Sequence, residues 1–107
     1  MKTPRRKTNK YEDFVTPERT LDFHGKGVLQ RSDIRKMCQQ FITESLAEGC
    51  TRLLIITGKG IHSENEPVVK RIVEEELALD IRVQSHKRAR RDRGGDGAFE
   101  VLLKQRI

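Results

Sequence analysis

Two residues able to perform acid–base chemistry stand two positions apart in the segment Leu21-Asp22-Phe23-His24. Apolar and polar residues alternate there, which predicts a half-buried strand with Leu21 and Phe23 turned toward the core. Asp22 and His24 would then share the other face of the sheet. An imidazole changes charge near neutral pH and exchanges a proton with a hydroxyl group, and a carboxylate beside it can orient it. The same segment also allows a plainer interpretation, in which His24 only caps its own turn.

Gly-Lys-Gly occurs twice, each time after an apolar segment and before a helical pattern. The copies are residues 25–27 and 58–60, and Thr57 precedes the second. Glycines leave backbone N–H groups accessible, lysine adds a cation, and a following helix N-terminus would add its dipole, so each turn favours phosphate. Neither copy has the GxxxxGK(S/T) pattern of a P-loop, which argues against nucleotide hydrolysis. His62 follows the second turn and would cap the next helix or contact the ligand. The phosphate-binding residues predicted from these turns are Gly25, Lys26, Gly27, Thr57, Gly58, Lys59, Gly60 and His62.

A third candidate segment, residues 86–97, is basic and then rich in glycine. Arginine suits phosphate because its planar guanidinium donates several hydrogen bonds, and clustered arginines are typical of surfaces that bind nucleic acid. A solvated loop is the plainer interpretation of the same charges. The residues predicted here to bind phosphate or nucleic acid are Arg88, Arg90, Arg91, Arg93, Gly94, Gly95 and Gly97.

The composition describes one small basic domain. The chain has 107 residues and a net charge of +6, and its two cysteines form no CxxC pair, which argues against structural zinc. Cys38 falls on the apolar stripe of a predicted helix and should be buried. No apolar run is long enough to span a bilayer, and none follows the basic N-terminus, so the expected location is the cytoplasm, with no membrane partner. Residues 1–19 show no sustained period, and we interpret them as a flexible basic arm before a domain at 20–107.

Six elements follow from hydrophobic periodicity, in the order βαβαββ. The first helix would be capped by Ser32 or Asp33 and stop at Gly49, and the second would begin near Pro67 and close at Leu79-Asp80. The predicted strands are residues 21–24, 52–57, 81–85 and 98–103.

This order predicts an α/β fold of the α+β two-layer kind, with a four-stranded mixed sheet and two helices. Parallel strands joined by helices place their carboxyl ends at one edge, and the last two strands can form an antiparallel hairpin. Both glycine turns and the arginine-rich loop would then leave from that edge, where open α/β sheets bind ligands. The acidic stretch 74–80 would lie at the opposite edge, and such a dipolar domain would steer a polyanion toward the glycine turns.

Three of these segments, in this order, resemble the motifs of the Smr (small MutS-related) domain family. They are LDFHG at residues 21–25, TGKG at 57–60 followed by His62-Ser63, and GGDGAF at 94–99, and the resemblance spans about residues 20–104. It implies a fold similar to the C-terminal domain of translation initiation factor 3. It implies DNA nicking or RNA cleavage, including cleavage of mRNA on stalled ribosomes. It also makes Asp22 and His24 the catalytic pair. Thr57 stands where many members have histidine, and a threonine cannot do acid–base work near neutral pH.

The leading hypothesis is therefore an endonuclease that cleaves or nicks phosphodiester bonds of DNA or RNA. With RNA, His24 could act at a 2′-hydroxyl group and no metal is required. With DNA, water must attack, and Asp22 could then hold a divalent metal; no other cofactor is expected. The alternatives are a module that binds DNA or RNA without cleaving it, and an enzyme acting on a small phosphate compound. The sequence does not separate DNA from RNA, and it predicts no oligomeric state.

Overall fold

The computed structural model describes residues 16–23, 26–27, 29–58, 66–89 and 97–104. The described residues follow the predicted βαβαββ order. They form β1 (Arg19–Asp22), α2 (Arg31–Ala47), β2 (Arg52–Ile56), α3 (Glu66–Leu79), β3 (Val83–Arg88) and β4 (Ala98–Leu103). None of the helices in this part of the chain is long and apolar enough to cross a membrane.

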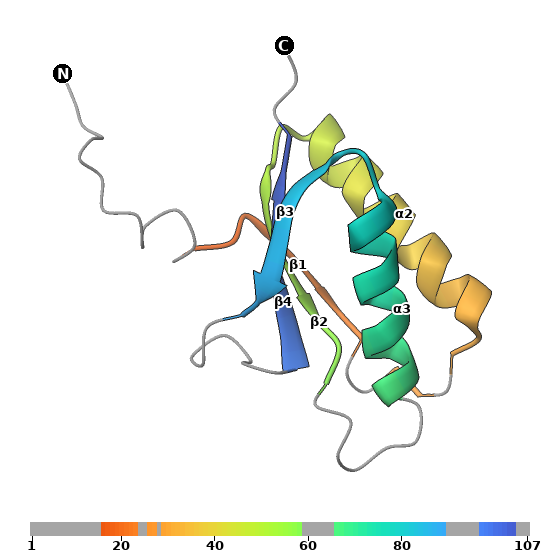
Figure 1. Ribbon diagram of the computed structural model, residues 1–107. Helices are drawn as coiled ribbons and strands as arrows, with labels where there is room; N and C mark the ends of the chain where they lie inside the picture. The colour runs from red at the N-terminus through yellow and green to blue at the C-terminus, as the bar shows by residue number, and fades with distance from the viewer. Residues whose placement is uncertain (1–15, 24–25, 28, 59–65, 90–96, 105–107) are drawn as a thin grey trace, which may run out of the picture.

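The strands form a mixed sheet in the order β1-β2-β4-β3. β1 and β2 are parallel, whereas β4 is antiparallel to both β2 and β3, so β1, β2 and β3 all run in the same direction. Both helices lie on one face of the sheet, as Figure 1 shows. The fold is therefore the predicted two-layer α+β sandwich, and the hairpin expected for the last two strands is confirmed.

The core lies between the sheet and the two helices. Each helix contributes an apolar stripe at helical spacing, and each strand of the sheet contributes alternate residues, so the two layers bury one continuous cluster. Cys38 is fully buried in it, as the sequence predicted. The other fully or nearly buried members are Phe23, Ile34, Phe41, Ile42, Leu53, Ile55, Val69, Ile72, Val73, Leu77, Phe99, Val101 and Leu103.

The start of α2 differs from the prediction. The N-cap residue is Gln30, not Ser32 or Asp33, and the Asp33 carboxylate accepts a hydrogen bond from the Gln30 backbone N–H at 3.3 Å. Asp33 thus caps the helix from within its first turn, where a carboxylate also complements the helix dipole. At the other end Gly49 adopts φ +80° and stops the helix, as predicted.

The first strand begins earlier than predicted, at Arg19 instead of Leu21, because polar groups before the apolar residues extend its pairing with β2. The Glu18 carboxylate accepts the backbone N–H groups of Thr51 at 2.8 Å and Arg52 at 3.0 Å, and these bonds lower its pKa. The Arg19 guanidinium lies 5.1 Å from the centre of the Phe41 ring. A charged residue therefore fits a half-buried strand position.

The third strand also differs: the sequence predicted residues 81–85, and β3 runs from Val83 to Arg88. A turn occupies the positions before it, and a bulge between Val83 and Ser85 breaks the alternation that the prediction used. The strand consequently continues into residues that were expected in the basic loop.

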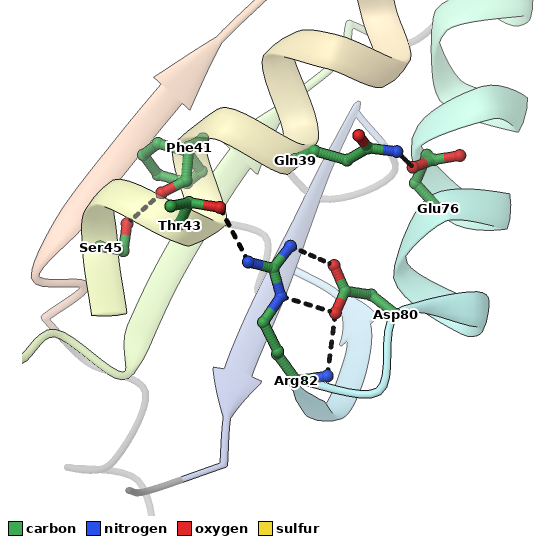
Figure 2. Close-up of polar contacts among 7 residues, drawn as sticks. All are labelled: Gln39, Phe41, Thr43, Ser45, Glu76, Asp80 and Arg82. Carbon is green, nitrogen blue, oxygen red and sulfur yellow. Dashed lines mark hydrogen bonds and ion pairs between the residues drawn. The ribbon is translucent and has the colours of Figure 1, made fainter. Parts of the chain in front are cut away.

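A polar cluster joins α2, α3 and the turn before β3 (Figure 2). Because Arg82 directly precedes Val83, this cluster lies at the opposite end of β3 from Arg88. Arg82 donates to both carboxylate oxygens of Asp80, at 2.8 and 3.0 Å, and to the Thr43 hydroxyl at 2.8 Å. Gln39 on α2 donates to the Glu76 carboxylate on α3 at 3.0 Å. These contacts fix both helices relative to the sheet at this end.

Candidate functional site

The carboxyl ends of three strands meet at one edge of the sheet. β1 ends at Asp22, which pairs with Ile56 at the end of β2, and Ile56 pairs with Ala98 at the start of β4. β3 ends at the same edge, with Arg88 paired to Phe99. The shared edge predicted from the element order is therefore present, and the described residues of all three sequence motifs meet along it.

One backbone carbonyl joins the second motif to the third. The Gly97 oxygen accepts hydrogen bonds from the Thr57 N–H at 2.7 Å and the Gly58 N–H at 3.0 Å. The Thr57 hydroxyl lies 3.2 Å from the same oxygen and 3.1 Å from the Gly58 carbonyl. All three hydrogen-bond donors of Thr57 and Gly58 thus point at protein oxygens. The sequence had predicted that these donors would face a phosphate.

Hydrogen bonds on either side continue this connection across the sheet. The Phe23 N–H donates to the Ile56 carbonyl at 2.8 Å, and the Ala89 N–H donates to the Ala98 carbonyl at 3.0 Å. Sequence reasoning did not single out Ala89. It is an apolar residue between two arginines, and this break in the basic run is the signal that could have shown the strand continuing this far.

Asp22 lies on the face of the sheet that points away from the helices. Leu21 and Phe23 on either side of it pack into the core, so alternation turns the Asp22 side chain the other way, where it is exposed. Its neighbours across the sheet on that face are Ile56 and Ala98, which belong to a small second apolar cluster. The orientation predicted for Asp22 is thus found, and its carboxylate is accessible beside an apolar patch.

The two Gly-Lys-Gly turns differ in their surroundings. Lys26 and Gly27 are exposed, the Lys26 N–H bonds to the Phe23 carbonyl at 3.3 Å, and Gly27 adopts φ +78°. Thr57 and Gly58 are buried, with φ +88° at Gly58. Only the first of these two pairs is accessible to a ligand in this arrangement.

Neither Gly-Lys-Gly turn leads directly into a helix, contrary to what the sequence pattern had suggested. α2 begins at Arg31, several residues after Gly27, and α3 begins at Glu66, several residues after Gly60. The field of a helix terminus falls off within its first turn, and a carboxylate from Asp33 already complements the N-terminus of α2. Phosphate binding at the first turn would therefore rest on the exposed Lys26 side chain and not on a helix dipole.

Arg88 and Asp22 reach the same edge but are not brought together. They lie on β3 and β1, the two outer strands, and Arg88 pairs with Phe99, whose side chain is in the helix-covered core. Arg88 therefore points to the helix side and Asp22 to the open side. Lys87, opposite Glu100, is an exposed basic residue on the same face as Asp22. Sequence reasoning missed Lys87 because it ended the strand at Ser85.

The remaining predicted site residues lie outside the residues that the structure describes, and their assignments stay predictions. They are His24, Gly25, Lys59, Gly60, His62, Arg90, Arg91, Arg93, Gly94 and Gly95. In the described ranges, no group of three or more histidine, cysteine, aspartate or glutamate residues could hold a metal ion.

The known structures similar to this chain include two Smr proteins. The Smr domain of Thermus thermophilus MutS2 has a TM-score of 0.68 and 27% sequence identity, over 80% of this chain and 98% of that one. YdaL, a stand-alone small MutS-related protein from Escherichia coli, has a TM-score of 0.72 and 28% identity, over 94% of this chain and 81% of that one. Comparison with curated protein sequences gives no match.

A sequence profile of the Smr domain matches residues 21–104. This range includes all three motifs, the second half of β1, and the whole of β2, β3 and β4. The match covers most of the chain, and the resemblance inferred from the motifs is confirmed. The chain belongs to the Smr domain family.

Proposed function

We propose that this protein is a nucleic-acid-binding endonuclease whose site is the sheet edge formed by the ends of β1, β2 and β3 and the start of β4. One observation carries the proposal: the three motif segments converge on one row of backbone hydrogen bonds, with an exposed carboxylate, Asp22, at its end. Membership of the Smr family supports it, because DNA nicking and RNA cleavage are the activities associated with that family.

Asp22 and His24 would supply the acid–base chemistry. Asp22 is exposed on the open face, and His24 follows after the buried Phe23, so continued alternation would put the imidazole on the same face. The carboxylate would orient the imidazole, which would accept a proton from the attacking hydroxyl group or return one to the leaving oxygen. The exposed Lys26 side chain would bind the non-bridging phosphate oxygens, where negative charge grows in the transition state.

The substrate decides which nucleophile is needed. RNA carries its own nucleophile in the 2′-hydroxyl group, so His24 and Lys26 would suffice for cleavage without a metal. DNA requires water as the nucleophile, and a divalent metal bound through Asp22 would lower the pKa of that water.

A second candidate, a module that binds nucleic acid without cleaving it, is favoured by one observation. Thr57 occupies the position where many Smr members have histidine, and its hydroxyl is buried against the Gly97 and Gly58 carbonyls. Thr57 therefore supplies no proton donor or acceptor for catalysis, and His24 would have to act without a second histidine at this position.

Cleavage assays with matched histidine variants separate these two functions. Supercoiled plasmid and a structured RNA are incubated with wild type, His24→Ala and His86→Ala, each with and without EDTA. His86 is the matched control, because it packs edge-to-face on Phe99, with ring centres 6.3 Å apart, on the helix-covered face. The proposal predicts cleavage by wild type and His86→Ala, with a loss of at least about 100-fold for His24→Ala.

Each other outcome has a distinct meaning. Equal cleavage by wild type and His24→Ala would contradict the catalytic role and indicate a contaminating nuclease. Salt-sensitive binding of DNA or RNA by all three proteins, with no cleavage, would establish the binding module. Cleavage by the wild type that disappears when EDTA is added would show that a divalent metal takes part.

A further inference from the structure

We propose that Thr57 is a positioning residue: with Gly58 it clasps the Gly97 carbonyl and fixes the distance between the end of β2 and the start of β4. The predicted phosphate-binding role of Thr57 and Gly58 is thereby replaced, and the other groups of the edge hold the ligand. This inference rests on the proposed function in so far as the edge is taken to bind nucleic acid.

Burial supports the positioning role. Thr57 is 1% exposed, and Gly58 is also buried. A phosphate could reach the Thr57 hydroxyl only by displacing it from the Gly97 carbonyl, and that carbonyl would lose a donor in a buried place. An unsatisfied buried polar group is costly, so the closed arrangement is favoured.

We use the word clasp for the hydrogen bonds from Thr57 and Gly58 to the Gly97 carbonyl. Ile56 pairs with Ala98, so the bond from the Thr57 N–H to the Gly97 carbonyl continues the β2–β4 pairing beyond the assigned strands. Gly58 then adopts φ +88°, a conformation that residues with a Cβ rarely adopt, and its N–H also points at the Gly97 oxygen. The Thr57 hydroxyl adds a side-chain hydrogen bond to the same Gly97 oxygen, at 3.2 Å.

The clasp lies in the middle of the edge, between the groups proposed to meet the ligand. On one side β2 is bonded to Phe23, next to Asp22, and on the other side β4 is bonded to Ala89, next to Arg88. A looser clasp would therefore change the spacing between Asp22 on β1 and Lys87 on β3, which share the open face of the sheet, without changing any charge. Thr57 would act on binding through the spacing of charged groups, whereas a direct contact would act through the missing hydrogen bond alone.

Three variants test this role by fluorescence anisotropy with a labelled single-stranded RNA and the matching DNA, over a range of salt concentrations. Thr57→Val keeps the shape and removes the hydroxyl, and Thr57→Ser keeps the hydroxyl. Ser45→Ala is the control, because Ser45 is fully buried and its hydroxyl donates to the Phe41 carbonyl at 2.7 Å within α2, away from this edge (Figure 2).

We expect Thr57→Val to weaken binding by about 3- to 10-fold, which is roughly the effect of removing one hydrogen bond. The dependence of log K on log salt should also become shallower, by about 0.7 for each phosphate of the single strand that the variant no longer neutralises. Thr57→Ser should restore both the affinity and the slope. Ser45→Ala should lower the melting temperature but leave both at the wild-type values.

The opposing results are distinct. Weaker binding of Thr57→Val with an unchanged salt slope would indicate a direct neutral contact and overturn the inference, as would wild-type affinity in that variant. A wild type that binds neither polymer at any salt concentration would overturn the proposed function instead.

Amide hydrogen exchange in the free protein tests the clasp without any ligand. Slow exchange at Thr57 and Gly58, and faster exchange at Gly58 in Thr57→Val, are expected. Fast exchange at both amides in the wild type would contradict the clasp even if no variant folded.

Discussion

At the scale of single residues, burial separates side chains that lie close together in the fold. Asp22 and Thr57 stand at or just beyond the ends of two neighbouring parallel strands, yet Asp22 is exposed and Thr57 is 1% exposed. The difference has two causes. Asp22 is on the face away from the helices, whereas alternation after Leu53 and Ile55 places Thr57 on the helix-covered face. β1 is also an outer strand, whereas Thr57 continues the β2–β4 pairing inside the sheet. Chemistry is therefore expected from β1 and support from β2.

Burial also predicts that the two cysteines react differently. Cys38 is fully buried, and its removal from water, together with the nearby Glu76 charge, raises the pKa of its thiol to about 12. Because the thiolate is the reactive form, Cys38 should resist iodoacetamide at pH 8, while the half-buried Cys50 is labelled. Mass spectrometry of the native protein should find one label, and none in Cys50→Ser. Labelling of Cys38 at the same rate in native and urea-unfolded protein would contradict this.

The Asp80–Arg82 pair predicts an acid-dependent part of the stability. The hydrogen bonds from Arg82 hold the pKa of Asp80 below its ordinary value of 3.8. A carboxyl group whose pKa is lowered by folding stabilises the protein above its unfolded pKa and loses this contribution as the pH falls through the folded value. Asp80→Asn should therefore cost about 1 kcal/mol in the free energy of unfolding near neutral pH. The cost should shrink as the pH falls below about 3.8.

A matched control for Asp80 is Glu75→Gln in urea unfolding at several pH values. Glu75 lies 3.8 Å from Arg35, and both side chains are about half exposed. An exposed pair of this kind contributes little, so a loss below about 0.5 kcal/mol is expected. Equal losses for Asp80→Asn and Glu75→Gln, or a loss for Asp80→Asn that does not change with pH, would contradict the role given to the Asp80–Arg82 pair.

At the scale of elements, two glycines with the same backbone conformation end different elements. Gly58 follows β2 with φ +88°, and Gly49 follows α2 with φ +80°. Adding a Cβ in this region costs about 1–2 kcal/mol, so Gly58→Ala and Gly49→Ala should lose comparable stability. Only Gly58→Ala should weaken nucleic-acid binding, because Gly49 lies at the end of α2, away from the edge. Melting curves and anisotropy measure the two effects, and equal loss of affinity in both variants would contradict the assignment.

Elements with a strong local pattern were predictable from the sequence. The apolar run of β4 indicated the bounds Ala98–Leu103, and the stripe through Ile34, Cys38 and Phe41 indicated the buried face of α2. The insertion of β4 between β2 and β3 was not predictable, because strand order depends on pairing between distant segments. The clasp of Thr57 on Gly97 depends on that order, so no local signal could reveal it. The extension of β3 to Arg88 was hidden by the bulge after Val83.

At the scale of the whole molecule, the fold separates two ends of different chemistry. The clasp, Asp22 and Arg88 lie at the carboxyl ends of the parallel strands. Asp80 lies just before β3, at the opposite end, where its N-terminal neighbours Glu74, Glu75 and Glu76 are on α3. The opposite edge predicted for the acidic stretch is confirmed for Asp80 by the bond from the Val83 N–H to its carbonyl at 3.0 Å. A polyanion should therefore approach with its phosphates toward the glycine turns.

The central claim is that nucleic acid binds at this one edge, and an NMR titration with a short RNA and the matching DNA tests it most directly. The account predicts that the amide signals of Gly27, Gly97 and Arg88 shift together with one of the two polymers or with both, while Gly49 at the far end of α2 does not move. Shifts with RNA alone or with DNA alone would also identify the substrate class. Binding that leaves Gly27, Gly97 and Arg88 unchanged, or that moves Gly49 most, would contradict the shared site.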